Sequence, residues 1–272
     1  MVMHQSRKFL FPSPRVCYHV AMKKVGIFDI DGTIYREALS FIVAEELLRR
    51  YDFPVERAEL ASAVHTYKSR GSTEAYWTYN KTVLDVFKRI LPKITPAQLG
   101  EVITYLLETR DDYCYAYTTQ LVERLKQEGR TLIAISGSIA NIVEPFTKSL
   151  GFDYTVASAL EVIDGSFTGE RATETKQGKD VILHDLINKH GLSLEDSIGI
   201  GDTHRDISFL KETAHPIAFN PNAALYNEAQ KNGWDIVIER KNMVFELSKQ
   251  GSTYVMRTAH PIFDDDNQEY LR

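Results

Sequence analysis

A short apolar run near the start of the chain ends in two acids, and this feature restricts the fold more than any other. In KKVGIFDIDGTIY (23–35), Asp29 ends the run and Asp31 stands directly before a glycine. Carboxylates at the end of a buried strand are costly unless a cation or hydrogen-bond donors compensate them. In α/β sheets, ligands lie beyond the carboxyl ends of the strands. Because side chains two residues apart on a strand share a face, Asp29 and Asp31 are expected to converge on one spot.

The remainder of the chain divides into two kinds of pattern. From residue 118 onward, short apolar runs such as TLIAIS (131–136) alternate with amphipathic stretches that end at Gly129 and Gly151. This alternation predicts an α/β fold, a doubly wound parallel sheet with helices on both faces. Asp164 and Gly165 stand between two short strand-like segments and predict a hairpin.

Residues 36–117 contain apolar positions at helical spacing and no convincing strand, so we expect an inserted four-helix cap there. The expected domains are therefore an α/β core (23–35 and 118–240), a helical cap (36–117), an N-terminal extension (1–22) and a C-terminal segment (241–272). The stretch VFELSKQGSTYVMR in the last of these suggests a second hairpin.

Three later segments carry residues suited to phosphate chemistry. SGS (136–138) follows a strand and is expected to open a helix, where a hydroxyl and free N–H groups bind phosphate. Lys179 lies near a helix start, against the helix dipole. In GDTHRD, Asp202 ends a strand and Asp206 follows four residues later; such acids suit a hard cation, above all Mg²⁺. Taken singly, these residues also suit helix caps, a solvated lysine or a loop aspartate.

The order DxDGT, SGS, Lys, GDxxxD resembles the haloacid dehalogenase (HAD) superfamily, in its phosphoserine-phosphatase-like branch, subfamily IB. The resemblance implies that Asp29 is the nucleophile and forms an aspartyl-phosphate. It implies that Asp31 is the general acid and then the base, and that Lys179 stabilises the phosphoryl group. Ser136 and the Gly137 amide would hold the phosphoryl oxygens.

The resemblance also implies a metal site and a second phosphate contact. Thr33 would assist phosphate binding, and Asp206 would support the metal or orient Lys179. The implied Mg²⁺ ligands are Asp29, Asp31 through its carbonyl, Asp202 and Asp206.

The expected activity is a Mg²⁺-dependent phosphatase that hydrolyses a small phosphomonoester. A phosphotransferase or phosphomutase with the same intermediate stays open, as does a non-catalytic phosphate-binding homologue. In phosphoserine phosphatases a glutamate after the first motif meets the substrate ammonium; Glu37 falls one residue early, with Ala38 in its place and Arg36 adjacent. Arg70 is the candidate cap arginine for a substrate carboxylate.

Composition limits the other function classes. The formal net charge is −5 and there is no long basic run, so nucleic acid is not an expected partner. No apolar run approaches ~20 residues, which excludes a membrane span. Two cysteines, Cys17 and Cys114, are sparse for 272 residues and indicate a reduced, cytoplasmic protein. A small-molecule phosphomonoester is the expected partner, of a monomer or homodimer.

Overall fold

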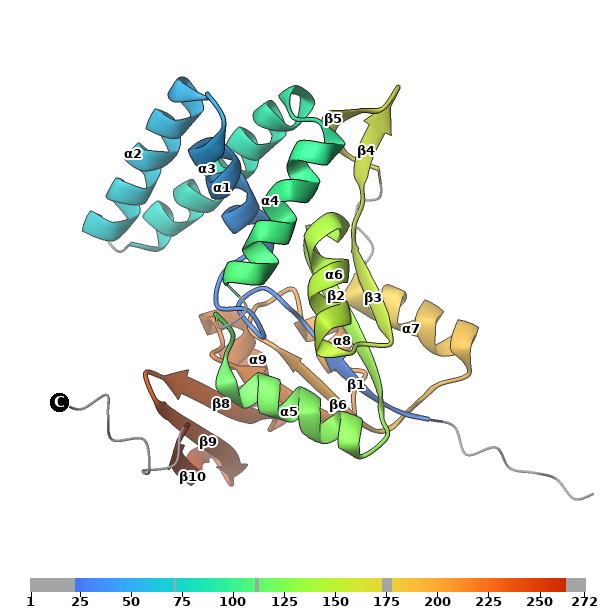
Figure 1. Ribbon diagram of the computed structural model, residues 1–272. Helices are drawn as coiled ribbons and strands as arrows, with labels where there is room; N and C mark the ends of the chain where they lie inside the picture. The colour runs from blue at the N-terminus through green and yellow to red at the C-terminus, as the bar shows by residue number, and fades with distance from the viewer. Residues whose placement is uncertain (1–22, 71, 111–112, 173–177, 263–272) are drawn as a thin grey trace, which may run out of the picture.

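The computed structural model describes residues 23–70, 72–110, 113–172 and 178–262. The described residues form an eight-stranded sheet, a separate two-stranded hairpin and helices around them (Figure 1). The order of the large sheet is β10-β9-β8-β7-β6-β1-β2-β3. Its strands are β1 (Lys24–Phe28), β2 (Thr131–Ile139), β3 (Tyr154–Ser158), β6 (Ser193–Gly201), β7 (His215–Phe219), β8 (Asp235–Arg240), β9 (Met243–Gln250) and β10 (Thr253–Pro261).

The first strand, β1, lies inside the sheet and pairs in parallel with β2 and β6. Its side chains alternate between two cores, as the pleat of a strand requires. Phe28 packs into one cluster of buried apolar residues, whereas Val25 and Ile27 pack into the other. An apolar strand that is buried on both faces is typical of a parallel sheet inside an α/β protein.

Each core cluster is completed by a layer of helices. On the face of Phe28 lie α5 (Ala116–Gln127) and α6 (Ala140–Leu150). On the opposite face lie α7 (Lys179–His190), α8 (Ile207–Leu210) and α9 (Ala223–Asn232). The predicted doubly wound α/β fold is confirmed.

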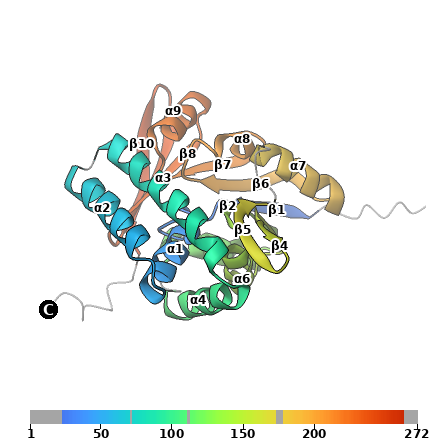
Figure 2. The same cartoon turned by 90° about the horizontal axis from the view of Figure 1, so that it is seen from above.

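A group of helices lies beyond the carboxyl ends of β1, β2 and β6 and forms the cap (Figure 1). Seen from the cap side, α3 crosses the view, and the β4–β5 hairpin lies beside its C-terminal end (Figure 2). The hairpin turns at Asp164 and Gly165, both with positive φ, as the sequence predicted. The bounds are α1 (Leu39–Arg50), α2 (Pro54–Arg70), α3 (Thr73–Ile90), the short 3₁₀ helix η1 (Leu91–Lys93), α4 (Pro96–Thr109), β4 (Leu160–Ile163) and β5 (Ser166–Arg171).

One local expectation is corrected. The SGS segment does not open a helix: β2 continues to Ile139, and α6 begins at Ala140 with Ile139 as its N-cap. The second expected hairpin is confirmed as β9–β10, and β9 also pairs with β8 and so extends the main sheet.

Two sequence expectations fall outside the described residues, namely those for residues 1–22 and for the tail after residue 262. No helix in the described part of the chain combines the length and the apolar character that a bilayer crossing requires.

Candidate functional site

The candidate site lies where β1 and β6 end side by side. Asp29 follows β1 directly, and its backbone N–H donates to the carbonyl of Ile200 on β6, 3.0 Å away. Asp202 follows the end of β6. Gly32 has a φ of +83°, and a Cβ there would stand 2.3 Å from Oδ2 of Asp202, so only glycine fits this turn. The tight turn thus lets the two aspartates approach each other.

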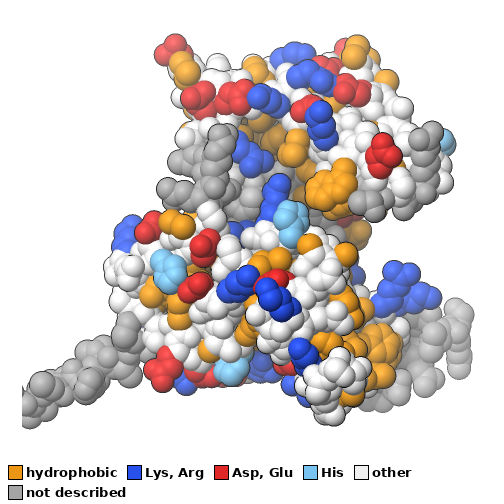
Figure 3. All heavy atoms as spheres, turned by 180° about the vertical axis from the view of Figure 1, so that it is seen from behind, with side chains coloured by type: hydrophobic (Ala, Val, Ile, Leu, Met, Phe, Trp, Pro, Cys, Tyr) orange, Lys and Arg blue, Asp and Glu red, His pale blue; other side chains and the backbone are white. Residues whose placement is uncertain are grey.

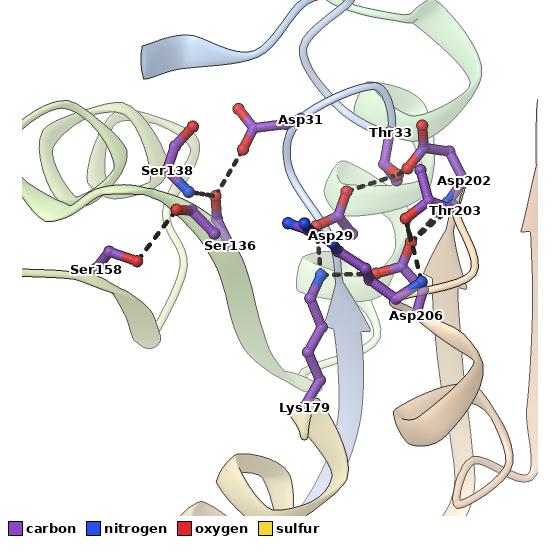
Figure 4. A network of polar contacts seen from close by, with 12 residues as sticks. Asp29, Asp31, Thr33, Ser136, Ser138, Ser158, Lys179, Asp202, Thr203 and Asp206 are labelled. Carbon is purple, nitrogen blue, oxygen red and sulfur yellow. Dashed lines mark hydrogen bonds and ion pairs between the residues drawn. The ribbon is translucent and has the colours of Figure 1, made fainter. Parts of the chain in front are cut away.

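Lys179 joins two of the acids. Its Nζ lies 2.5 Å from Oδ1 of Asp29 and 2.6 Å from Oδ1 of Asp206 (Figure 4). The other carboxylate oxygen of Asp206 accepts the backbone N–H groups of Asp202 and Thr203 at 3.1 and 2.9 Å. Asp206 therefore holds both the lysine and the loop after β6.

Asp31 faces different partners from Asp29. Its Oδ1 accepts the N–H of Leu39, the first residue of α1, at 2.7 Å, and its Oδ2 accepts the hydroxyl of Ser136 at 2.9 Å. Figure 4 shows Asp31 turned toward Ser136 and Asp29 toward Lys179. The two acids thus have different hydrogen-bond partners, although the charge of Asp31 still acts on Asp29.

Burial displaces the protonation equilibria of these groups. It raises the pKa of Asp29 to about 7, against the opposing charge of Lys179. Burial also raises the pKa of Asp31, although the Leu39 N–H and nearby hydroxyls oppose this. The pKa of Asp202 rises well above its ordinary value through burial and then through the charge of Asp29. Burial alone would lower the pKa of Lys179, but the charges of Asp206 and Asp29 raise it.

The donor set fits a hard divalent cation. Asp29, Asp202 and Asp206 each offer a carboxylate oxygen, and these oxygens lie within 4.8 Å of one another. Carboxylate oxygens are the ligands that Mg²⁺ prefers. The three acids face one lysine, which leaves an excess of negative charge. The pKa values of Asp29 and Asp202 are raised first by burial, and the charges of neighbouring acids add to this effect. An added cation would remove the imbalance.

The expected phosphate contacts lie around the same acids. The hydroxyl of Thr33 lies 3.2 Å from Oδ2 of Asp29 and 3.5 Å from Oδ1 of Asp202, so it positions two carboxylates. Ser136 is fully buried and donates to Asp31. The carbonyl of Gly137 accepts the hydroxyl of Ser158 at 3.1 Å, which fixes the peptide after Ser136.

Of the three expected substrate contacts, Arg36 and Glu37 have described side chains, and both lie near Tyr113. The Nη2 of Arg36 lies 2.7 Å from Oε1 of Glu239 on β8, and its Nε donates to the carbonyl of Cys114. Glu37 is exposed and interacts with Tyr113. Arg70 is the last residue of α2, and its side chain lies outside the described part of the structure.

Several residues beside the site were not singled out from the sequence. Arg205 lies inside the GDTHRD segment, and its position between two acids was a usable signal. Arg171, at the end of β5, and Glu239 gave no local signal.

Trp77 on α3 contacts the ring of His204 with centroids 6.5 Å apart, so cap and core meet at the site.

Comparison with known proteins gives a consistent assignment. The model of the haloacid dehalogenase-like hydrolase family matches residues 27–211. A phosphoserine phosphatase from Methanocaldococcus jannaschii is 32% identical over 126 residues, covering 46% of this chain and 57% of that protein. The chain spans about half the length of the curated relatives it matches.

Two solved structures share the fold. A protein of unknown function from Bordetella pertussis Tohama I is 22% identical, with a TM-score of 0.64 over 80% of this chain and 99% of that chain. A phospho-aspartyl intermediate analogue of phosphoserine phosphatase is also 22% identical, with a TM-score of 0.56 over 81% of this chain and 95% of that one. The family model extends over more than half of the chain and includes every motif residue from Asp29 to Asp206; the chain belongs to the haloacid dehalogenase-like hydrolase family.

Proposed function

We propose that this chain is a Mg²⁺-dependent phosphatase of small phosphomonoesters and that Asp29 carries the phosphoryl group as an aspartyl-phosphate. One observation carries the proposal: two neighbouring acids have different surroundings. Asp29 is bound to Lys179, whereas Asp31 is held by Ser136 and the start of the cap. The pKa is raised for both acids, so the contacts distinguish them: the lysine beside Asp29 favours the ionised form that a nucleophile needs, whereas the printed contacts of Asp31 are neutral donors, which suits a proton donor.

The first step transfers the phosphoryl group to the protein. An Asp29 carboxylate oxygen attacks phosphorus, and the bond from phosphorus to the leaving oxygen breaks. Protonated Asp31 gives its proton to that oxygen, so the alcohol leaves neutral. Lys179 offsets the repulsion between the carboxylate and the phosphate dianion.

The second step returns Asp29 to its carboxylate form. Asp31, now ionised, takes a proton from water, and the water oxygen attacks phosphorus. The bond between phosphorus and Asp29 breaks, and inorganic phosphate leaves. Asp29, Asp202 and Asp206 would hold Mg²⁺, which when bound neutralises charge on the phosphoryl oxygens.

The names of the relatives support the proposed phosphatase but do not identify its substrate. The Methanocaldococcus protein is a phosphoserine phosphatase by name, and the solved phosphoserine phosphatase is described as a phospho-aspartyl intermediate analogue. A phosphotransferase or phosphomutase would use the same first step and replace water with another acceptor. A non-catalytic phosphate-binding protein would have no need of Asp31 as a proton donor.

Hydrolysis of p-nitrophenyl phosphate tests the proposal. We expect turnover with Mg²⁺, its loss in EDTA, and its recovery when Mg²⁺ is restored. Asp29→Asn should lower kcat by at least about 10³-fold, because the amide is a poor nucleophile. The matched control is Asp185→Asn, which changes an exposed acid on α7 and should leave kcat unchanged.

Mass spectrometry of acid-quenched wild type should place a phosphoryl group on the peptide that contains Asp29. Near-normal activity of Asp29→Asn would show that the nucleophile is assigned wrongly. Added glycerol should not divert the phosphoryl group; substantial transfer to glycerol would favour the phosphotransferase. Absence of turnover under all conditions would favour the binding protein.

A further inference from the structure

Two arginines meet at Gly137, on the cap side of the sheet. Arg171 ends β5, and its Nη1 donates to the carbonyl of Gly137 at 3.1 Å and to the hydroxyl of Ser158 at 3.2 Å. Arg205 lies in the loop between β6 and α8, and its Nη1 is 4.0 Å from the position that a Gly137 Cβ would take. Two guanidinium groups from distant parts of the chain thus border one peptide.

Among the described residues, no carboxylate lies within salt-bridge distance of Arg171 or Arg205. Within the same residues, the contacts of Arg171 use its Nη1, and no acceptor lies at its Nη2 or Nε. By contrast, Arg36 pairs with Glu239, and Arg130 pairs with Asp196.

The two charges act on each other. Burial, followed by the charge of Arg205, lowers the pKa of Arg171, and only Asp31 opposes this. Like charges that are held together destabilise a site unless an anion joins them. Seen from behind, Lys, Arg and His side chains lie along the boundary between the helical cap and the core (Figure 3). An oxyanion bound there would relieve the repulsion.

The position of the pair indicates which part of a substrate it meets. Lys179 lies with Asp29 and Asp206, on the side of the nucleophile. Arg171 binds the carbonyl of Gly137, the residue after Ser136, and the hydroxyl of Ser136 donates to Asp31, the proposed donor to the leaving oxygen. The arginines therefore lie on the leaving-group side, while Lys179 and the metal site face the phosphoryl group.

We propose that Arg171 and Arg205 together bind an oxyanion carried by the leaving group, either a carboxylate or a second phosphate. The substrate class is then a phosphomonoester with a second anionic group. A guanidinium presents a planar fork of N–H donors that matches both anions. This assignment rests on the proposed phosphatase function, and it gives Arg171 and Arg205 the anion-recognising role that the sequence suggested for Arg70.

A matched set of substrates tests the assignment. 3-Phosphoglycerate carries a carboxylate where glycerol 3-phosphate carries a hydroxymethyl group, and 1,3-propanediol bisphosphate carries a second phosphate. We expect Arg171→Gln and Arg205→Gln each to raise KM about 10- to 100-fold for one of the two anionic substrates. KM for glycerol 3-phosphate and p-nitrophenyl phosphate should change less than about twofold. The anionic substrate that is affected identifies which oxyanion is bound.

Controls separate recognition from damage to the fold. Arg124→Gln removes an exposed arginine of α5 and should change no KM. Arg171→Lys keeps the charge but removes the planar fork of N–H donors. Its KM for the affected anionic substrate should therefore lie between those of wild type and Arg171→Gln. An equal rise in KM for p-nitrophenyl phosphate would show that the pair binds the reacting phosphoryl group, which would overturn the proposal. Unchanged KM values for all four substrates would overturn it as well.

Calorimetry with the Asp29→Asn protein makes the test independent of turnover. The Asp29→Asn protein that also carries Arg171→Gln should bind the preferred anionic substrate about 10-fold or more weakly than Asp29→Asn alone. Its affinity for glycerol 3-phosphate should be unchanged. If wild type hydrolyses nothing yet this difference appears, the phosphatase proposal fails and the binding assignment holds. If hydrolysis is normal and no difference appears in binding or KM, only the arginine assignment fails.

Discussion

The carboxyl groups of the site are the residues most sensitive to solution conditions. Burial raises the pKa of Asp29 from 3.8 to about 7 and also raises that of Asp202. A raised pKa means that the folded protein binds the proton more tightly than the unfolded chain does. The stabilisation is complete below the unfolded pKa, near 3.8, and is lost as pH rises through about 7.

The metal-free protein should therefore become less stable from about pH 5.5 to about pH 8. For a single group with the pKa of Asp29, the loss in free energy of unfolding is on the order of 2 kcal/mol. Bound Mg²⁺ should reduce the loss, because it compensates the ionised acids. Urea unfolding with and without Mg²⁺ measures both effects. A metal-free protein that gains stability over this range would contradict the assignment of the acids.

At the scale of elements, the cap is coupled to the site through α1 and α3. The N–H of Leu39, which opens α1, binds the proposed proton donor Asp31, and Ser40 exchanges hydrogen bonds with the end of β2. Trp77 on α3 reaches the ring of His204, in the loop that carries Asp202 and Asp206. Motion of the cap would thus change the surroundings of Asp31 directly.

Trp77→Ala should lower kcat/KM for p-nitrophenyl phosphate about 2- to 10-fold. An aromatic edge contact contributes about 0.5–1.5 kcal/mol, and its loss shifts the equilibrium of cap closure by that amount. Steady-state kinetics measures the effect. His204→Gln should have a similar effect, with no further loss in the double variant. Tyr226→Ala removes an exposed aromatic residue of α9 and is the matched control. An equal loss of kcat/KM in Tyr226→Ala would refute a specific role for the contact between Trp77 and His204.

The sequence pointed to Asp29, Asp202 and Lys179 because each stands at a strand end or helix start that local patterns reveal. Asp29, Asp202 and Lys179 lie together as their positions predicted. The pairing of Arg36 with Glu239 could not be predicted in this way, since only the folded chain brings Glu239 beside Arg36. Arg171 was missed for a similar reason: its position depends on where the β4–β5 hairpin packs, and no local pattern encodes that.

At the scale of the molecule, Glu239 connects the core with both chain segments that enter and leave the cap. Its buried carboxylate binds Arg36 on the outgoing segment at 2.7 Å. It also accepts the backbone N–H groups of Ala116 and Tyr117 on the returning segment, at 3.3 and 2.9 Å. One side chain on β8 therefore fixes the root of the cap.

Glu239→Ala should lower the free energy of unfolding by about 2–4 kcal/mol, because it leaves Arg36 and two partly buried N–H groups without their acceptor. Thermal and urea unfolding measure the loss. Glu59→Ala, which breaks the exposed ion pair with Arg89 in the cap, should cost less than about 1 kcal/mol. A loss for Glu239→Ala no larger than that of Glu59→Ala would exclude its role as the anchor.

The order of strands also has a consequence for folding during synthesis. The strand before Asp29 has β2 and β6 as its neighbours, and both are translated after the cap helices. On the ribosome, the cap helices can pack through contacts that are close in sequence, whereas β1 cannot pair until β2 and β6 have been synthesised. A nascent chain that ends before residue 202 lacks one of the three acids of the candidate metal site, so under the proposed function it would be inactive as a phosphatase.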